Sequence, residues 1–520
     1  MLRVGIVLDS VQSSEWKARL IEELESRGLA RIEVAFINDS VSASQSRLFS
    51  YYERWDRLRR SGGQDALEAH DLTSLLRTHT IVYLRNIVPP LTPELDVLLD
   101  LCDRPLSHTL GASPRLGTWY LQFGRPEQYG VGSPHLFWEL YRRDPVSEIT
   151  LLAVDGMETR ILACSVSATH KLSLHLSRNP LYWKAVEMVL HALKQAEHLG
   201  RDYLDRSELH TRVISSTCKP GLQHVLSLAF HQAFAIAGRR VAAFDPRNRA
   251  KWYLAIRPRS LNRSFCDASE YALLQSPPDR FYADPCLFDH NGKTYLLFED
   301  FRYADDRALI SGCEVYKDGT LGETFEVLKR PYHLSYPLVF EDNGEIYLVP
   351  ESRGSRSIEL YRAVKFPTDW VAEPPLLSGV QAVDATIHKI DNLYWMFTSI
   401  TNGLYSSCDD LSLFFSPSLK GPWAPHLRNP LIRDVRKARS AGSLFYDGGR
   451  LIRPSQDCSE AYGYAIVFSE ITKLSETEYE DREICRVKPL LEKHHEATHT
   501  YTRNDQFEIV DRLIAPKHAS

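Results

Sequence analysis

The sequence lacks the features that mark several large classes of protein. Its 520 residues carry a net charge of −5 with a pI near 6.5, so no basic field favours nucleic acid or an anionic surface. No run of about 18 apolar residues occurs, so we expect no transmembrane segment. The opening stretch MLRVGIVLDS has no signal-peptide pattern. We therefore expect a cytoplasmic enzyme or binding protein.

Closely spaced cysteine pairs and nucleotide-binding glycine motifs are also missing. The nine cysteines are scattered, and no CxxC occurs. This spacing suggests neither a zinc knuckle nor a disulfide framework, so we expect a reducing compartment and predict no metal ligands. The first 200 residues contain neither GxGxxG nor GxxxxGK[ST], so no sequence motif there indicates nucleotide binding.

What is present first is an alternation of strand-like and helix-like segments. A chain of this length predicts two or three domains, and 43% apolar with 25% charged residues is typical of a globular protein. Strands alternating with helices predict an α/β domain with a mainly parallel sheet over residues 1–205. The expected strands are 2–8, 32–37, 79–86 and 149–156, and the expected helices are 14–28, 94–103 and 179–204.

Residues 206–248 form a predicted helical connector. The segment 222–238, LQHVLSLAFHQAFAIAG, is apolar on more than one face, and the basic stretch RRVAAFDPRNR follows it. Such a helix packs between domains or lies on a membrane surface, here through 221–240. His224 and His231 share one face, but two histidines without a third ligand favour a structural role.

From residue 249 onward the pattern changes to short strands, and one frame recurs four times. FYADPCLFDHNGKTYLLFED, LSYPLVFEDNGEIYLVPE, AVDATIHKIDNLYWMFTS and RSAGSLFYDGGRLIRPSQD align with spacings of 52, 48 and 57 residues. A period near 50 with several strands per unit is typical of a β-propeller. We predict five blades over 249–520, with 251–258 and 498–513 sharing the blade that closes the ring.

The repeat frame also predicts a site. In a propeller the innermost strands line a central funnel, so Asp284, Tyr336, Asp384 and Ser440 or Ala441 should surround one pocket. Two carboxylates facing a funnel suit acid/base or nucleophilic chemistry on a sugar, and we predict Asp284 and Asp384 as catalytic residues. The alternative is that both aspartates only shape strand ends. The predicted substrate-binding residues are Tyr282, Glu299, Asp300, His333, Tyr336, Glu351, Arg439, Arg453, Gln456, Asp457 and His499.

These motifs resemble known families. FYADPCLF, RPYHLSYPLVFEDNGEIYLVPES, VDATIH, ARSAGSLF and RPSQDCSEAYGYAI are similar to the N-terminal propeller of plant glucosamine inositolphosphorylceramide transferases, which also occurs in bacterial proteins, and to the five-bladed propellers of glycoside hydrolase family 43. The hydrolase resemblance implies that Asp284 is the catalytic base and Asp384 the auxiliary aspartate that tunes it and positions the substrate. The acid Glu of the fourth blade has no counterpart in ARSAGSLF. This departure favours transfer over hydrolysis, because protonating the leaving oxygen contributes about 10²- to 10⁴-fold.

The N-terminal segment 116–163 resembles formyltetrahydrofolate-dependent formyltransferases. The Asn-x-His of that family falls on Tyr120 and Gln122, and its later Asp falls near Glu158. The resemblance therefore implies a degenerate formyltransferase-like fold without the activity, and no folate cofactor is expected.

Together these features predict a carbohydrate-active enzyme of surface-glycan or glycolipid biosynthesis. We expect glycosyl transfer in the propeller funnel, a nucleotide sugar as donor, a saccharide or glycolipid as partner and no nucleic acid. The alternatives are a non-catalytic glycan-binding or assembly protein and a sugar N-formyltransferase. The sequence leaves the oligomeric state open.

Overall fold

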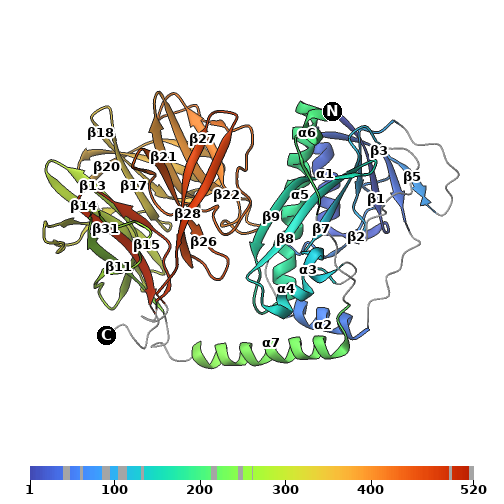
Figure 1. Ribbon diagram of the computed structural model, residues 1–520, viewed down its shortest axis with the longest axis horizontal. Coiled ribbons are helices and arrows are strands. Elements are labelled where there is room, and N and C mark those ends of the chain that lie inside the picture. Colours follow the sequence, from blue (N-terminus) through green and yellow to red (C-terminus); the bar gives the residue numbers. More distant parts are fainter. Residues whose placement is uncertain are drawn as a thin grey trace. The chain divides into compact units, whose positions relative to one another are not determined.

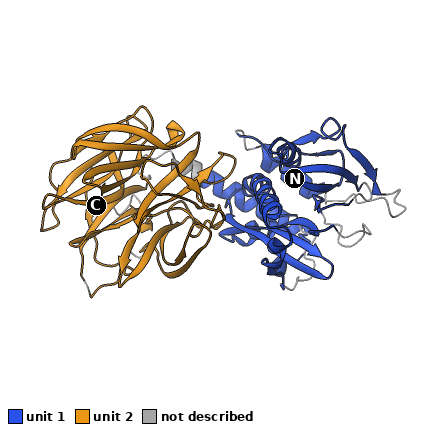
Figure 2. Cartoon of the chain, turned by 90° about the horizontal axis from the view of Figure 1, so that it is seen from above, with its two compact units in different colours: residues 1–238 blue, residues 239–520 orange. Residues whose placement is uncertain are grey.

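The computed structural model describes residues 1–38, 47–58, 63–84, 94–103, 114–130, 134–211, 219–243, 250–260, 262–490 and 495–514. The chain divides into two compact units, Met1–Gly238 and Arg239–Ser520 (Figure 2). The boundary lies inside the predicted 206–248 connector.

Unit 1 is built on an eight-stranded sheet with the order β10-β9-β8-β7-β6-β1-β3-β5 (Figure 1). Neighbouring strands from β5 to β7 are parallel, and those from β7 to β10 are antiparallel. The predicted α/β fold with a parallel sheet is therefore present, with an antiparallel extension at one side. The strands are β1 (Leu2–Leu8), β3 (Ala30–Ile37), β5 (Thr80–Tyr83), β6 (Val97–Asp100), β7 (Thr118–Phe123), β8 (Val146–Asp155), β9 (Glu158–Ala168) and β10 (Glu208–Leu209).

Helices accompany this sheet, and a short hairpin pairs β2 (Gln12–Ser14) with β4 (Ala69–Asp71). The predicted long helix is present, but it is divided at Gly200 into α5 and α6. The helices are α1 (Glu15–Ser26), α2 (Arg47–Leu58), α3 (Pro126–Tyr129), α4 (Phe137–Arg142), α5 (Leu174–Leu199), α6 (Arg201–Asp205) and α7 (Leu222–Ala243).

The predicted helix over 94–103 is wrong, because the structure has strand β6 there. All four residues of β6 are buried, and β6 pairs in parallel with both β1 and β7. A parallel strand buried on both faces is a continuous apolar run without alternation, which sequence periodicity does not separate from a helix.

Unit 2 is a five-bladed β-propeller, as predicted. Four blades are consecutive four-stranded sheets, and the fifth has the order β12-β11-β31-β29, with β30 also on β31. Strand β11 (Lys251–Pro258) pairs with β31 (Phe507–Ile514) along its whole length, which closes the ring as expected. The remaining strands follow in chain order: β12 (Ala272–Leu274), β13 (Arg280–His290), β14 (Lys293–Arg302), β15 (Arg307–Val315), β16 (Phe325–Leu328), β17 (Ser335–Asp342), β18 (Glu345–Glu351), β19 (Ser357–Lys365), β20 (Asp369–Ser378), β21 (Gln381–Ile390), β22 (Leu393–Thr401), β23 (Ser412–Ser416), β24 (Ala424–Pro425), β25 (Phe445–Asp447), β26 (Arg450–Asp457), β27 (Ala465–Leu474), β28 (Tyr479–Val487), β29 (His495–Ala497) and β30 (Tyr501–Arg503).

The core of the propeller lies between its blades. Each of five buried apolar clusters combines residues of two adjacent blades. One of these clusters joins the closing blade to the first blade. Leu254 of β11, for example, packs with Leu296 of β14, and both side chains are fully buried. Ring closure therefore completes a continuous belt of apolar contacts.

A disulfide joins Cys266 to Cys485, with 6.0 Å between the Cα atoms. The expectation of reduced cysteines is wrong for this pair. The two cysteines are 219 residues apart, so no local spacing could indicate the bond. Disulfides are rare in a reducing cytoplasm, so this bond argues against the predicted cytoplasmic location. The location stays a prediction.

A backbone bulge recurs at the repeat position noted in the sequence. Asp284, Tyr336 and Asp384 have φ angles of 50°, 45° and 50°, and the strand register shifts at each of them. A bulge re-aims the side chain at its position, and non-glycine residues in this left-handed region are concentrated at functional sites. The repeat frame thus carries a backbone feature as well as a sequence pattern.

Candidate functional site

A pocket of about 250 Å³ lies within the propeller, at the bulged ends of the inner strands. Its walls come from blades one, two, four and five. Carboxylates, basic side chains and aromatic rings face the same space, which is the composition expected of a polar-ligand site. The lining residues are Trp252, Phe281, Ala283, Asp284, Glu299, Phe301, His333, Ser335, Glu351, Arg439, Tyr462 and His499.

Asp284 is buried and surrounded by donors. Thr500 Oγ1 donates to its Oδ1 at 2.8 Å, the backbone N–H of Tyr336 donates to its Oδ2 at 3.2 Å, and His499 Nε2 lies 3.1 Å from Oδ1. Burial opposes ionisation, but the charge of His499, the hydrogen bonds from His499 and Thr500 and the charge of Arg439 outweigh it, so the pKa of Asp284 lies below its usual range. Asp284 is therefore a carboxylate.

His499 lies between two carboxylates. Its Nδ1 is 2.8 Å from Oδ2 of the buried Asp511, and its Nε2 faces Asp284. Burial opposes protonation, but the charges of Asp511 and Asp284 raise the pKa of His499 well above its usual value. The three residues thus form a carboxylate–imidazolium–carboxylate chain.

The same chain is the cluster within the described residues whose spacing suits a metal, with ligand atoms within 4.8 Å of one another. An imidazolium has no free lone pair for a metal ion, and each ring nitrogen already faces a carboxylate. The arrangement therefore fits an ion-pair chain better than a metal centre.

Two glutamates face the pocket, and their pKa values are shifted in the opposite direction. Burial, followed by the charge of Asp284, raises the pKa of Glu299 well above its usual value. Burial and the charge of Asp384 do the same for Glu351. Glu299 enters beside Asp284, because its strand position pairs with Ala283. The pocket thus combines one carboxyl group with a lowered pKa and two with a raised pKa, which is the separation that acid/base sites require.

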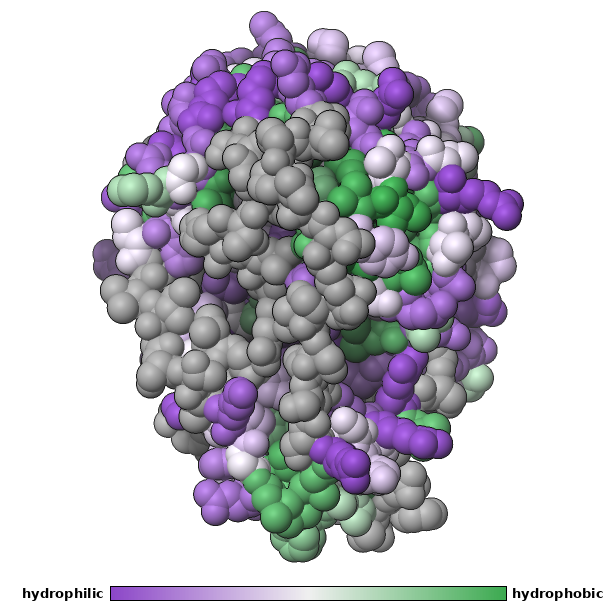
Figure 3. All heavy atoms as spheres, turned by 90° about the vertical axis from the view of Figure 1, so that its right-hand side faces the viewer, coloured by the Kyte–Doolittle hydropathy of each residue, from purple (hydrophilic) through white to green (hydrophobic). Residues whose placement is uncertain are grey.

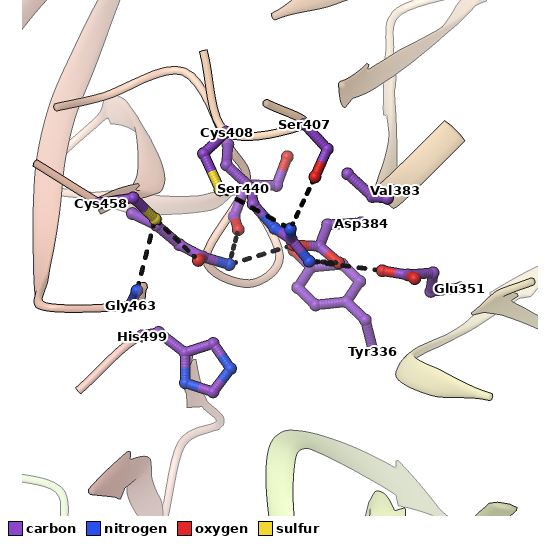
Figure 4. Close-up of polar contacts among 12 residues, drawn as sticks. Tyr336, Glu351, Val383, Asp384, Ser407, Cys408, Ser440, Cys458, Gly463 and His499 are labelled. Atoms are coloured by element: carbon purple, nitrogen blue, oxygen red, sulfur yellow. Dashed lines mark hydrogen bonds and ion pairs between the residues drawn. The ribbon is translucent and has the colours of Figure 1, made fainter. Parts of the chain in front are cut away.

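Behind the pocket, Asp384 is held by a polar cluster (Figure 4). Arg439 donates to Asp384 through Nε at 2.5 Å and Nη2 at 3.2 Å, and Gln456 Nε2 donates to it at 3.0 Å. Arg439 Nη2 also reaches Glu351 Oε2 at 3.4 Å. The cluster positions Arg439 at the pocket wall and gives Asp384 no face in the pocket lining.

Tyr336 crosses the centre of the ring. Its hydroxyl lies 2.8 Å from Thr386 Oγ1 and accepts a hydrogen bond from the backbone N–H of Gly442 at 2.7 Å. The second blade is thereby linked to the third and fourth. These hydrogen bonds give a physical reason for a tyrosine at the position where the first and third blades have aspartates.

Six of the residues predicted from sequence line the pocket. Asp384, Gln456 and Tyr336 lie one layer behind them. The six are Asp284, Glu299, His333, Glu351, Arg439 and His499.

The other four predicted substrate-binding residues do not line the pocket. Tyr282 packs in the core between the first and fifth blades. The charged three are engaged by other side chains of their own blades: Asp300 by Arg280 at 3.3 Å and Ser311 at 3.0 Å, Arg453 by Tyr479 at 3.1 Å and Asp481 at 3.0 Å, and Asp457 by Arg486.

Sequence reasoning missed part of the aromatic wall. Trp252, Phe301 and Tyr462 lie in the pocket, and Phe281 stacks on Phe301 with 4.8 Å between the ring centroids. Phe281 and Phe301 face each other because their strand positions are paired. The turn at Asn291 sets the pairing of β13 with β14, so the contact of Phe281 with Phe301 could have been predicted from sequence. Trp252 and Tyr462 lie outside the four repeated segments and could not.

In unit 1 the residues at the formyltransferase positions do not come together. Tyr120 and Gln122 lie on β7, where Gln122 pairs with Thr150. Glu158 begins β9 and pairs with Asp155. Asp155 lies five residues beyond Thr150 on β8, which is about 17 Å at the rise per residue of an antiparallel strand. The separation agrees with the strand register and leaves Gln122 and Glu158 without a shared site. Whether the domain is related to formyltransferases stays a prediction.

Residues 266–513 match the sequence family described as glucosamine inositolphosphorylceramide transferase 1, N-terminal. The matched range begins after β11 and ends within β31, so it covers most of the propeller. The match therefore shows a sequence similarity between this family and most of the propeller, within which the carboxylate-lined pocket lies.

Curated relatives carry the same name. Glucosamine inositolphosphorylceramide transferase 1 of Arabidopsis thaliana is 36% identical over 211 residues, and that of Oryza sativa subsp. japonica is 34% identical over 209. The aligned regions cover 40% and 39% of this chain. The chain spans 28% of the length of each relative, so their transferase activity is that of much longer proteins.

Solved structures with similar folds include carbohydrate-active enzymes. An α-L-arabinofuranosidase domain of Coprinopsis cinerea has a TM-score of 0.34 at 12% identity, covering 45% of this chain and 90% of that one. An exo-β-1,3-galactanase of Phanerochaete chrysosporium has a TM-score of 0.30 at 16% identity, covering 39% and 51%. Scores this low carry no argument about function.

Proposed function

We propose that the propeller funnel binds a saccharide and transfers a glycosyl group in glycolipid biosynthesis. The observation that carries the proposal is that Asp284 and Glu299 line one aromatic-walled pocket, with the pKa of Asp284 lowered and that of Glu299 raised. Aromatic rings stack on the apolar faces of sugars, and carboxyl groups in opposite protonation states supply the base and the acid of glycosyl chemistry.

The proposed step is a displacement at the anomeric carbon. Asp284 accepts the proton of the acceptor hydroxyl as its oxygen forms the new bond, and Glu299 donates a proton to the departing oxygen. Each carboxyl group then returns to its starting state by proton exchange. Arg439 and His499 keep positive charge beside the reacting atoms.

The structure changes one part of the sequence argument. The absent glutamate of the fourth blade was taken to disfavour hydrolysis. Glu299 of the first blade and Glu351 of the second line the pocket with raised pKa values, so either could serve as the proton donor in its place. Transfer is favoured instead by the names of the curated relatives, which are transferases acting on inositolphosphorylceramide. We propose a nucleotide sugar as donor and a glycolipid as acceptor.

Helix α7 supports access to a lipid acceptor. Val225 and Leu228 are buried against unit 1, whereas a stripe at four-residue spacing is exposed. Residues 222–238 include no Asp, Glu, Lys or Arg. Figure 3 shows exposed hydrophobic atoms near the lower edge of its view, and α7 with α2 lies along the lower edge of unit 1 in Figure 1. We propose peripheral membrane contact through this stripe, with unit 1 as scaffold or acceptor module. The stripe is Leu222 (61% exposed), Leu226 (54%), Phe230 (68%) and Phe234 (74%).

Within the described residues, no helix is both long and apolar enough to cross a bilayer. Residues 244–249 and the side chains of 239–243, which form the stretch RRVAAFDPRNR after the apolar segment, lie outside the described part of the chain.

The test is nucleotide release from a panel of nucleotide sugars, with and without inositol phospholipid acceptors. Wild type is compared with Asp284→Asn, and Asp305→Asn on an exposed turn serves as the matched control. We expect acceptor-dependent release that falls at least about 100-fold in Asp284→Asn and is unchanged in the control. Equal nucleotide release by wild type and both variants would show that Asp284 does not act as the catalytic base.

A second candidate is saccharide binding without turnover. Asp284 is contacted by Thr500, Tyr336 and His499, and its own N–H donates to Asp511 at 3.2 Å, which also suits a structural carboxylate. In that case sugars protect the chain against thermal unfolding, and no donor is consumed by wild type or variant. Sugar N-formylation loses support from the separation of Gln122 and Glu158.

A further inference from the structure

Two free cysteines converge behind Arg439 in the propeller. Cys408 lies in the segment between β22 and β23, and Cys458 directly follows β26, so they come from the third and fourth blades. The two residues are 8% and 5% exposed, and their sulfur atoms hydrogen-bond within one polar cluster, Cys408 to Arg439 and Cys458 to Gln456. Figure 4 shows both sulfur atoms on the same side of the cluster that holds Asp384.

Each sulfur contacts a different residue that binds Asp384. Arg439 Nη1 donates to Cys408 Sγ at 3.8 Å, while Nε and Nη2 of the same guanidinium bind Asp384. Cys458 Sγ lies 3.6 Å from Gln456 Oε1, while Gln456 Nε2 donates to Asp384 at 3.0 Å. The thiol pair is therefore the outer layer of the cluster that orients Arg439 at the pocket wall.

The surroundings favour a thiolate at Cys408. The hydrogen bond from Cys458, followed by the charge of Arg439, lowers the pKa of Cys408 to about 6 despite its burial. The bond to Cys408 and burial raise the pKa of Cys458 well above its usual value. One member of the pair is thus a nucleophile and the other a protonated thiol next to it, which is the arrangement of a reactive cysteine with its resolving partner.

We propose that Cys408 and Cys458 are an oxidation site, at which hydrogen peroxide converts the thiol pair into a reversible disulfide that removes the sulfur contact of Arg439. The thiolate of Cys408 attacks one peroxide oxygen, which forms a sulfenic acid and expels hydroxide. The sulfur of Cys458 then attacks Cys408 Sγ, and water leaves with the proton of Cys458. The two sulfurs lose two electrons and the peroxide gains them, so the step is balanced.

The expected consequence follows from the contacts. A disulfide sulfur carries no charge, so Cys408 no longer balances the guanidinium of Arg439. Sulfur atoms about 2.05 Å apart also sit closer together than hydrogen-bonded thiols, so the loops that carry them must shift. Arg439 and Gln456 would then lose their outer contacts, and we expect looser binding of pocket ligands in the oxidised chain.

The test is peptide mapping of the full chain after titration with hydrogen peroxide. We expect a Cys408–Cys458 cross-linked peptide at about one equivalent of peroxide, reversed by dithiothreitol, and absent in Cys408→Ser and in Cys458→Ser. Cys313→Ser, a buried free cysteine of the first blade, is the matched control and should retain the cross-link.

Sulfinic or sulfonic acid at Cys408 without a cross-link, or no reaction at either residue, would overturn the proposal. Because the mapping is done on wild type, it stays decisive if a serine variant fails to fold. It also requires no turnover, so its failure is distinguishable from failure of the proposed glycosyl transfer.

Discussion

Arg439 and Asp384 form a doubly hydrogen-bonded ion pair, at 2.5 and 3.2 Å, in which both side chains are buried. Arg439→Met removes the cation and leaves a buried carboxylate with Gln456 as its remaining donor. We expect the free energy of unfolding to fall by about 3–5 kcal/mol, because an unpaired buried charge keeps its desolvation cost. Guanidinium unfolding followed by tryptophan fluorescence measures this.

The matched control for that variant is Arg482→Met. Arg482 pairs with Glu470 at 2.7 Å, but its side chain is 72% exposed, so we expect a loss of at most about 1 kcal/mol. Equal losses in the two variants would contradict a structural ion pair behind the pocket.

The contribution of Glu299 and Glu351 to stability should fall as pH rises above their ordinary pKa of 4.5. Burial lowers the pKa of histidines such as His135, which gives a contribution of the opposite sign. Glu299 and Glu351 keep their protons in the folded chain, whereas they lose them near the ordinary value of 4.5 once unfolded. The folded state therefore binds more protons at these two groups above pH 4.5, and each group contributes a slope of up to about −1.4 kcal/mol per pH unit. His499 is protonated in both states below its ordinary value of 6.5, so it adds its own loss only above that pH.

Denaturant titrations at several pH values measure this slope. Glu299→Gln and Glu351→Gln should each flatten it, because an amide mimics the protonated carboxyl group without titrating. Glu314→Gln, in a surface ion pair with Lys293, should leave the slope unchanged. A slope equal in all four proteins would show that the two glutamates are ionised.

His499 should remain protonated well above neutral pH. Its ring faces Asp284 at 3.1 Å and Asp511 at 2.8 Å, and both charges hold the proton. Ring-proton NMR shifts should therefore show no titration between pH 6 and 8, at variance with an ordinary histidine pKa of about 6.5. Asp511→Asn should move the titration of His499 downward, and titration of the wild-type ring near pH 6.5 would refute the ion-pair chain.

Tyr336→Phe should destabilise the propeller by about 1–3 kcal/mol, because the N–H of Gly442 and the hydroxyl of Thr386 lose a buried partner. Thermal unfolding checks this. Tyr446→Phe, at a residue 55% exposed, is the control and should change little. Similar shifts in both variants would mean that Tyr336 does not link the blades.

Phe230→Ser combined with Phe234→Ser should reduce sedimentation with phosphatidylcholine–phosphatidylserine vesicles. The two side chains are 68% and 74% exposed, and each contributes about 1.5–3 kcal/mol when fully buried in an apolar phase. Met157→Ser, at a fully exposed residue away from α7, should bind as wild type does. No binding by wild type, or equal binding by the double variant, would argue against membrane contact through α7.

The repeat frame allowed most of the propeller to be predicted from sequence. A fixed period puts equivalent residues on equivalent strands, and Asp284, Tyr336 and Asp384 do share the same bulged strand position. The period does not say how deep each residue lies. Asp384 and Tyr336 are behind the pocket, because Arg439 and the hydroxyl contacts of Tyr336 occupy the space in front of them.

The features that escaped prediction depend on long-range contacts. Cys266 and Cys485 meet because the ring closes, and Trp252 reaches the pocket from the closing blade. The protonation of Glu299 and Glu351 likewise follows from burial beside other carboxylates, which no sequence spacing encodes. Strand β6 was mistaken for a helix because burial on both faces removes the alternation that identifies strands.

Ring closure by β31 also sets an order of events during synthesis. His499 and Thr500 precede β31, and Asp511 lies on it, so these three partners of Asp284 emerge from the ribosome more than 200 residues after Asp284 itself. Until they arrive, the first blade holds a carboxylate without its counter-charge and an edge without its neighbour. The site and the closed ring are therefore completed together, and a chain cut before residue 499 would lose both at once.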